Sequence, residues 1–459
     1  MLNMNVSSIS VKSLNYTPDI RKAEAAFASG DVEALSGELT ALFPHDPDLH
    51  RVGDLVRGAL GAPTQKLALS GTAALFFENI ARTKQLLGSP GPDPCHQYRM
   101  LVGAGFDFIA NLDGIPGWTI PQFLNFLVIG QIRPTRHAAV VGTMRDDGIY
   151  ALEWIAYYLA LGFEHIFIYT NDNADGSEAL LRVLAERKII TLIESETSGE
   201  VGPEAKAYEH SLQFLHHLRD FEWVFYADSD EYFVPASRFG NSVLKVLAML
   251  EEKFPDRLPS AICYPWLWFI SDMAFAREPG LLIERFQHAR HHWITKSLVR
   301  PRDIVSMRHE HFPDVKHGGF LVDSALAPLP FDVRDQWKGH NPQYAGGRIN
   351  HYWPKSFEEF AIKKARGQAI KLKENLYDRP FELFFAWNGY ASKDNHYPIS
   401  PVILQRVRKK IEALKEIEGV SALADRIDRG FSALLRHYYS GRHDLRRLYA
   451  RHNTEPTQM

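Results

Sequence analysis

The chain has 459 residues and is 45% hydrophobic, so it is long enough to bury more than one core, and we expect two or three modules. Its 52 Lys and Arg residues against 55 Asp and Glu residues leave a formal charge of −3. This balance argues against a protein drawn as a whole to nucleic acid or to an anionic membrane, so any basic site must be local.

The two cysteines, Cys95 and Cys263, are too few for a disulfide framework or a thiolate metal site, and they favour a reducing compartment. The first residues lack the pattern of a signal peptide, and no apolar run reaches the roughly 18 residues of a membrane span. We therefore expect a cytoplasmic protein without an integral membrane segment. Peripheral attachment to a membrane stays open.

The first part of the chain has helical periodicity, with Pro and Gly between its segments, and predicts a helical N-terminal module over residues 1–110. Residues 111–136 are rich in Gly, Pro and aromatic side chains, which indicates a linker. At the other end, two amphipathic segments and a basic end predict a helical tail over residues 401–459. We expect this tail to pack against the domain before it.

Between them, strand and helix patterns alternate from His137 onward. Short apolar runs such as AAVVGTM, HIFIYT and IITLIE are typical of buried strands, and LEWIAYYLALG and SEALLRVLAERK are typical of amphipathic helices. This alternation predicts an α/β domain over residues 137–400, built on a doubly wound, mainly parallel sheet. Ligands of such sheets bind beyond the carboxyl ends of the strands.

One predicted strand, within WVFYADSDEYFVP, ends in acidic residues. In an extended chain Asp228 and Asp230 point to the same side, so two oxygen ligands converge. Such a pair suits Mg²⁺ or Mn²⁺, which bind few carboxylates and complete their shells with phosphate oxygens and water. The same pair could instead cap a helix or fill a turn, but three buried acids at a strand end are costly without a cation.

Two loops are expected at the same edge of the sheet, TMRDDG at 143–148 and TNDNADGS at 170–177. A nucleoside bound to an open sheet would lie there. The Asp175-Gly176 pair marks a tight turn. Asp175 either contacts the ligand or simply caps the helix that follows.

From VVGTMRDDGIYALEWIAYYLALG through WVFYADSDEYFVP to INHYWPKSFEEFAIKKARG, the sequence resembles the glycosyltransferase family 2-like group that includes the family 92 proteins. The resemblance covers roughly residues 137–370. It implies a GT-A fold and a metal-dependent transfer of a sugar from a nucleotide-diphosphate donor, UDP- or GDP-linked, to a glycan or other hydroxyl acceptor.

The resemblance also implies roles for individual residues. Asp228 and Asp230 would hold the metal, Mn²⁺ or Mg²⁺, together with the donor diphosphate, and His351 is the candidate third metal ligand. Contacts with the nucleotide-sugar would come from Arg145, Asp146, Asn171, Asp175, Lys296 and Arg300. The chain departs from the wider family 2 pattern, which places an acid near Thr170 and Asn171, so the nucleobase stays open.

After His351, Ser356 and Glu359 form a capping-box pattern at a helix start, whose free N–H groups could face a phosphate. Lys363, Lys364 and Arg366 follow and could neutralise a leaving diphosphate, or could form a solvated face. Trp266, Trp268 and Phe269 could stack on a sugar, although aromatic runs at strand spacing are more often core.

The resemblance favours inversion, which needs a carboxylate base, and three acids after the metal motif are candidates: Asp272, Glu284 and Asp314. A rival hypothesis is a divalent-metal phosphohydrolase or nucleotidyltransferase that uses His309-Glu310-His311. A third is a non-catalytic scaffold that binds a nucleotide or a glycan. The donor sugar, the acceptor, the linkage and the oligomeric state are not predicted, and no basic aromatic stripe indicates nucleic-acid binding.

Overall fold

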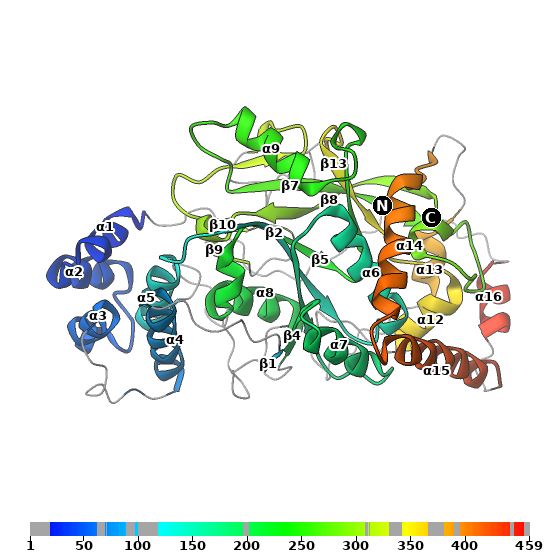
Figure 1. Ribbon diagram of the computed structural model, residues 1–459, viewed down its shortest axis with the longest axis horizontal. Coiled ribbons are helices and arrows are strands. Elements are labelled where there is room, and N and C mark those ends of the chain that lie inside the picture. The colour runs from blue at the N-terminus through cyan, green and yellow to red at the C-terminus, as the bar shows by residue number, and fades with distance from the viewer. Residues whose placement is uncertain are drawn as a thin grey trace.

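The computed structural model of the chain (Figure 1) describes residues 19–61, 69, 71–88, 97–99, 118–195, 202–307, 311, 313–329, 342–365, 381–389, 395–440 and 445–453. It is a mixed α/β structure with helices at both ends of the chain. Within these ranges no helix combines the length and the apolar character needed to cross a membrane.

The N-terminal helices gather at one end of the molecule (Figure 1) and share their own apolar core, which includes Leu35, Leu55 and Phe123. They are α1 (Arg21–Ser29), α2 (Val32–Leu42), α3 (Val52–Leu60), α4 (Gly71–Gly88) and α5 (Ile120–Ile129). The amphipathic periodicity of the sequence accounts for helices α1 to α4, because each of them buries one apolar face against its neighbours.

Helix α5 lies in the segment 111–136 that the sequence indicates as a linker. Every residue of α5 is buried, and its Asn125 accepts a 2.8 Å hydrogen bond from Asn79 of α4. Gln122 of α5 donates to Gln213 of the next domain at 3.0 Å. The segment therefore holds the helical module against the α/β domain, and only its residues 111–117 fall outside the described ranges.

Among the described residues the strands form an 11-stranded sheet and a separate two-stranded sheet of β9 (Ile304–Ser306) and β10 (Asp314–Val315). The main path of the large sheet runs β1-β4-β3-β2-β5-β8-β7-β11-β12, and β13 pairs with β6 and β7. Its strands are β1 (Gln97–Arg99), β2 (Arg136–Met144), β3 (His165–Thr170), β4 (Thr191–Glu194), β5 (Phe221–Asp228), β6 (Glu231–Pro235), β7 (Ala261–Ile270), β8 (His288–Val299), β11 (Leu321–Asp323), β12 (Pro328–Leu329) and β13 (Gly347–His351).

Strand β2 lies between β3 and β5 and is parallel to both. The chain moves outward from β2 to β3 and β4 and then returns to the other side of β2 as β5. The strand order therefore reverses between β2 and β5. In open α/β sheets this reversal leaves a crevice at the carboxyl ends of the two strands, which is where ligands bind.

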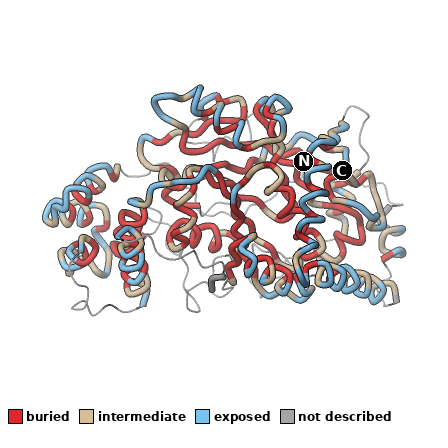
Figure 2. The backbone as a smooth tube through the Cα atoms, viewed as in Figure 1, coloured by how far each residue is buried: buried red, intermediate tan, exposed pale blue. Residues whose placement is uncertain are grey.

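Alternate side chains of the central strands enter two different cores, one on each face of the sheet. Ala138 and Val140 face a core shared with α6 (Gly148–Leu161), α7 (Ser177–Glu186) and α9 (Val243–Lys253), whereas Ala139 and Val141 face α8 (Pro203–Phe214). Figure 2 shows the central strands buried, as expected for a sheet that is covered on both faces.

Beyond β5 the sheet becomes mixed. Strand β8 is antiparallel to both β5 and β7, so β7 runs in the same direction as β5. Strand β13 runs parallel to β7 and antiparallel to β6, which places His351 opposite both Trp268 and Glu231. These pairings bring late parts of the chain to the edge where β5 ends.

The later helices α12 (Phe357–Ala365), α13 (Glu382–Trp387), α14 (Pro401–Lys415), α15 (Val420–Ser440) and α16 (Leu445–Asn453) lie at the end of the molecule opposite the N-terminal helices (Figure 1). The short helix α10 spans Leu282–Arg285. Helix α14 packs on α6, and α15 packs on α6 and α7. Ile403, Val407 and Ile427 carry these contacts into the core of the α/β domain.

A glycine in β2 makes room for the side chain that fixes the end of β5. Trp154 of α6 is fully buried, and its Nε1 donates a 2.9 Å hydrogen bond to the carbonyl of Asp228. A Cβ atom at Gly142 would lie 2.6 Å from this ring. The rigid indole therefore requires glycine at position 142.

We expect Gly142→Ala to lower the free energy of unfolding by about 1–3 kcal/mol, because an overpacked core must shift the Trp154 ring or the strand. Urea unfolding followed by circular dichroism measures this change. The matched control is Gly37→Ala in α2, where nothing lies within 4 Å of the new methyl group and the substitution should stabilise the helix. Equal stability of Gly142→Ala and the wild type would contradict this packing account.

Candidate active site

The candidate site lies where β5 ends, at the reversal of strand order. Asp228 is the last residue of β5, a two-residue turn follows, and β6 begins at Glu231. Ser229 donates a 2.6 Å hydrogen bond from its hydroxyl to Asp147 in the loop after β2, and the carbonyl of Asp230 accepts one of 2.9 Å from the Tyr352 amide. The turn is thus fixed from both sides.

The two aspartates of this turn have separate partners. The carboxylate of Asp228 accepts from the Tyr208 hydroxyl at 3.2 Å and lies 3.3 Å from Lys296 Nζ. Asp230 instead faces the segment that follows β13. The sequence analysis expected the two carboxylates to converge because it assumed an extended chain from Asp228 to Asp230. In the structure β5 ends at Asp228, so the alternation of side chains along an extended strand does not apply to Asp230.

Lys296 of β8 is fully buried among three carboxylates. Its Nζ lies 3.4 Å from Glu204, 3.3 Å from Asp228 and 3.6 Å from Glu231. A buried ammonium is stable only beside such counter-charges. Burial raises the pKa of Glu231 well above its usual range, against the opposing effect of Lys296.

Asp230 is held by three groups from β13 and the segment after it. Its Oδ1 lies 3.4 Å from His351 Nε2, and its Oδ2 lies 3.5 Å from Lys355 Nζ and bonds to Lys363 Nζ. Burial alone would raise the pKa of Asp230, but Lys363 and Lys355 hold it well below its usual value. Asp230 is therefore negatively charged although only 7% of its side chain is exposed.

The imidazole of His351 packs against two neighbouring tryptophans of β7, with ring centroids 4.1 Å from Trp266 and 5.1 Å from Trp268. Burial lowers the pKa of His351 even though Asp230 lies beside it, so the ring is neutral. Its Nδ1 is buried and has no hydrogen-bond partner among the described residues. Trp266, Trp268 and Phe269, considered from the sequence as a sugar platform, are themselves buried.

Lys355 has an uncommon backbone conformation for a non-glycine residue, φ +53°. Its ammonium lies 4.7 Å from the centre of the Tyr150 ring, and its side chain is almost fully buried. Directly after it, the expected capping box is present: Ser356 Oγ accepts from the Glu359 amide at 3.3 Å, and Glu359 accepts from the Ser356 amide at 3.1 Å.

The capping box is tied to the rest of the domain through Glu359. Arg285 of α10 lies 2.7 Å from the Glu359 carboxylate, and the Tyr150 hydroxyl donates to it at 2.7 Å. The Glu359 side chain is completely buried. The start of α12, and with it Lys355, is therefore fixed by α6 and α10.

The loops after β2 and β3 use their aspartates to hold each other. Asp146 accepts from the Ala174 amide at 2.6 Å and from the Asp175 amide at 3.2 Å. Asp175 accepts from the Gly148 amide at 2.8 Å and the Ser177 amide at 2.9 Å. Both carboxylates therefore have a structural role. Asp175 bonds to the first residue of α7, Ser177, although the N-cap position itself is Gly176.

Two further predicted nucleotide contacts lie on these loops. The side chain of Arg145 is 25% exposed and lies 4.0 Å from Asp146. Asn171 is half-buried directly after β3. Both stand at the carboxyl edge of the sheet, beside the turn that carries Asp228.

Three predicted residues lie away from this group. Arg300 pairs with Glu222 at 2.6 Å and with Asp303 at 2.8 Å. Since β8 is antiparallel to β5, residues just beyond its Val299 end lie near the amino end of β5, opposite Asp228. Glu284 pairs with Arg408 of α14 at 2.5 Å, and Asp314 faces Ser306 in the two-stranded sheet.

Asp272, the remaining base candidate, follows the carboxyl end of β7. Its carboxylate lies 2.5 Å from His288 Nδ1, and both side chains are about one-third exposed, 38% and 34%. Asp272 and Met273 both have positive φ, 49° and 63°. Two residues on, the carbonyl of Ala274 accepts from the Phe357 amide at 2.9 Å, so this loop touches the start of α12.

Of the His309-Glu310-His311 segment that the rival metal hypothesis uses, the structure describes only His311. His311 is buried, with Nδ1 2.9 Å from the carbonyl of Thr295. His309 and Arg366 lie outside the described residues. In the part of the chain that the structure describes, no three His, Cys, Asp or Glu side chains are already placed to hold a metal ion.

Sequence reasoning missed several members of the site: Lys355, Glu204, Tyr208 and His288. Lys355 carried a usable signal, because it stands directly before a capping box whose helix start could face an anion. The other three come from α8 and β8, and only the tertiary packing shows where those elements lie.

Residues 149–368 match the model of the family described as Glycosyltransferase family 92. The matched region begins after Arg145 and Asp146 and includes Asp228, Asp230 and the segment from β13 to α12. No curated protein matches the chain significantly. The chain therefore carries a glycosyltransferase family 92 domain over residues 149–368, and it is a glycosyltransferase.

Proposed function

We propose that this chain is a metal-dependent, inverting glycosyltransferase of the GT-A type, which moves a sugar from a UDP- or GDP-linked donor to a hydroxyl group of a glycan. One observation carries the proposal. A carboxylate, a neutral imidazole and two ammonium groups, those of Asp230, His351, Lys355 and Lys363, meet at the carboxyl edge where the strand order reverses. This combination suits a divalent cation together with a diphosphate.

The side chains fit a divalent cation of the Mn²⁺ or Mg²⁺ kind. Asp230 Oδ1 and His351 Nε2 are 3.4 Å apart, and two neighbouring ligands of one octahedral ion stand roughly 3 Å apart for bonds of about 2.1 Å. His351 is neutral, as a ligand must be. Asp230 and His351 would hold the ion, and the ion would supply Lewis-acid stabilisation of the diphosphate. Asp228 would join them as the second carboxylate by turning its side chain away from Lys296, which lies 3.3 Å from it.

The lysines would stabilise the negative charge that develops on the leaving diphosphate. Lys355 and Lys363 lie beside the proposed ion position, in surroundings with little solvent, where a fixed cation is more effective than in water. Lys355 in particular is held by the Glu359 network and needs little reorganisation when charge develops. Arg145 and Asn171, on the neighbouring loops, are the proposed contacts to the nucleoside.

Asp272 is the acid that the geometry favours as base. It lies after β7, at the same sheet edge as Asp228, and its loop contacts the start of α12. In the proposed reaction Asp272 takes the proton of the acceptor hydroxyl, the acceptor oxygen bonds to the anomeric carbon, and the bond to the diphosphate breaks with its electron pair. His288 orients Asp272 and is a positioning residue.

The substitution Asp230→Asn removes the charge of the proposed metal ligand with little change of shape. We expect kcat/KM for the preferred nucleotide-sugar to fall by about 10³-fold, since the loss of metal-based stabilisation costs several kcal/mol. The test is a panel of UDP-, GDP- and dTDP-sugars, each assayed with and without Mn²⁺. Full wild-type activity in a chelator would contradict the metal dependence, and wild-type activity of Asp230→Asn would contradict the site.

For the base, we expect Asp272→Asn to lower kcat for sugar transfer by about 10²–10⁴-fold, the usual contribution of general-base catalysis, with unchanged nucleotide binding. Steady-state transfer assays and calorimetric titration with UDP or GDP measure the two effects. The control is Glu284→Gln, which alters a surface pair with Arg408 and should leave kcat close to that of the wild type. Equal loss in both variants would exclude Asp272 as the base.

A further inference from the structure

Two lysines converge on one oxygen of Asp230, and they are held very differently. Lys355 is 3% exposed, has a fixed backbone of positive φ, and precedes the buried capping box. Lys363 comes from α12, is 14% exposed, and reaches Asp230 through its flexible four-carbon side chain. Of the two, Lys363 is the one whose ammonium can move without disturbing the fold.

The contact between Lys363 and Asp230 conflicts with metal binding at the same carboxylate. An ammonium bonded to Asp230 already neutralises part of the charge that would attract a divalent cation, and it repels that cation at close range. His351 Nε2 lies 3.4 Å from the other oxygen of the same carboxylate, so Lys363 occupies the Oδ2 side of Asp230. Lys363 therefore competes with the cation for Asp230.

A donor diphosphate would resolve this conflict. It brings negative oxygens to the same edge of the sheet, and ammonium groups bind phosphate well. If Lys363 moves from Asp230 to the diphosphate, Asp230 becomes available to the cation, and the repelling charge is neutralised. Binding of either ligand then favours binding of the other, as thermodynamic linkage requires.

We propose that Lys363 is an exchangeable counter-ion of Asp230, a positioning residue that couples the binding of the divalent cation to the binding of the nucleotide diphosphate. This inference rests on the metal site of the proposed function. It adds to that function a prediction about affinities: the free protein binds the cation weakly, and a nucleoside diphosphate strengthens that binding.

The test measures Mn²⁺ affinity directly, by electron paramagnetic resonance of free Mn²⁺, with and without saturating UDP or GDP. For the wild type we expect the nucleotide to tighten Mn²⁺ binding between about 5-fold and 150-fold, the usual range of coupling between sites. Lys363→Met should bind Mn²⁺ without nucleotide at least 5-fold more tightly than the wild type and show a smaller nucleotide effect.

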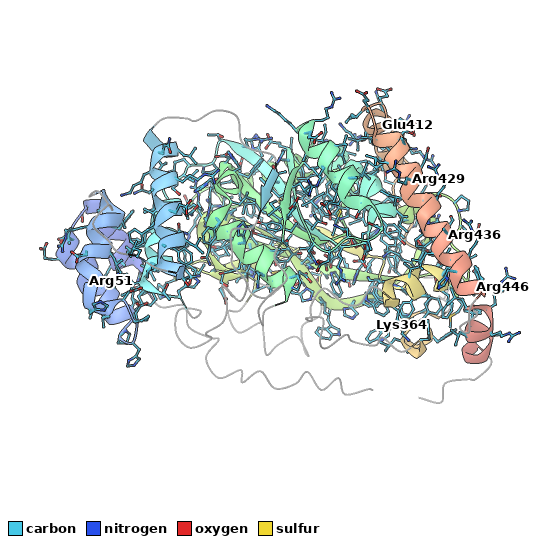
Figure 3. The ribbon with its side chains drawn as sticks, turned by 90° about the horizontal axis from the view of Figure 1, so that it is seen from below. Arg51, Lys364, Glu412, Arg429, Arg436 and Arg446 are labelled. Carbon is cyan, nitrogen blue, oxygen red and sulfur yellow. The ribbon has the colours of Figure 1, made fainter. Side chains whose placement is uncertain are left out.

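Two controls separate charge from structure. Lys363→Arg keeps the positive charge beside Asp230 and should keep the wild-type Mn²⁺ affinity in the absence of nucleotide. Lys364→Met changes the neighbouring lysine of α12, which is labelled in Figure 3. The ammonium of Lys364 lies 3.9 Å from the centre of the Phe381 ring, so this variant should also leave the Mn²⁺ affinity unchanged. Thermal unfolding of all variants checks that they are folded.

The possible failures are distinguishable. If Lys363→Met binds Mn²⁺ no more tightly than the wild type while Asp230→Asn abolishes binding, the metal site stands and the exchange is overturned. If the wild type and Asp230→Asn bind Mn²⁺ equally poorly even with nucleotide present, the metal dependence fails and the inference fails with it.

Discussion

The structure of this site depends on compensating negative charge at the end of one buried strand. Asp228, Asp230 and Glu231 lie at or directly after the end of β5, and Glu204 of α8 joins them through Lys296. An isolated carboxylate as buried as that of Asp230 would be strongly destabilising, and at Glu231 burial raises the pKa and so favours the neutral form. Lys296, Lys355 and Lys363 supply the positive charge. The acids could not be brought together without these partners.

This requirement explains why the sheet extends beyond its parallel half. Strand β8 delivers Lys296 to Asp228, and the path from β13 into α12 delivers His351, Lys355 and Lys363 to Asp230. The parallel strands alone would leave the acids without counter-charges. The Glu359 network then holds the start of α12 in place, so one end of the charge cluster is rigid while the long side chain of Lys363 keeps some freedom.

Much of this arrangement could be predicted from the sequence, because it is recorded in local patterns. The alternation of strands and helices indicates the parallel half of the sheet, the acidic end of β5 marks the site, and the spacing of Ser356 and Glu359 gives the capping box. His351 came from family resemblance, and it does lie beside Asp230. Apart from His351, each of these signals lies within a few residues of the feature that it predicts.

What could not be predicted depends on the direction and packing of whole elements. Arg300 lies near the amino end of β5 because β8 is antiparallel, a choice that no local pattern reveals. Asp146 and Asp175 hold two loops together. This role could be predicted only if the two loops were known to be neighbours. The segment expected to be a linker contains the buried helix α5, whose apolar run packs against α3, α4 and α8, contacts that no local pattern reveals.

The most direct measurement is anomalous diffraction from crystals of the wild-type protein soaked with Mn²⁺ and with UDP or GDP. The account predicts a manganese peak at coordination distance, about 2.1 Å, from Asp230 and His351, with the diphosphate contacting Lys363. A nucleotide bound at this edge with no manganese near Asp230, or a manganese bound elsewhere in the domain, would contradict it.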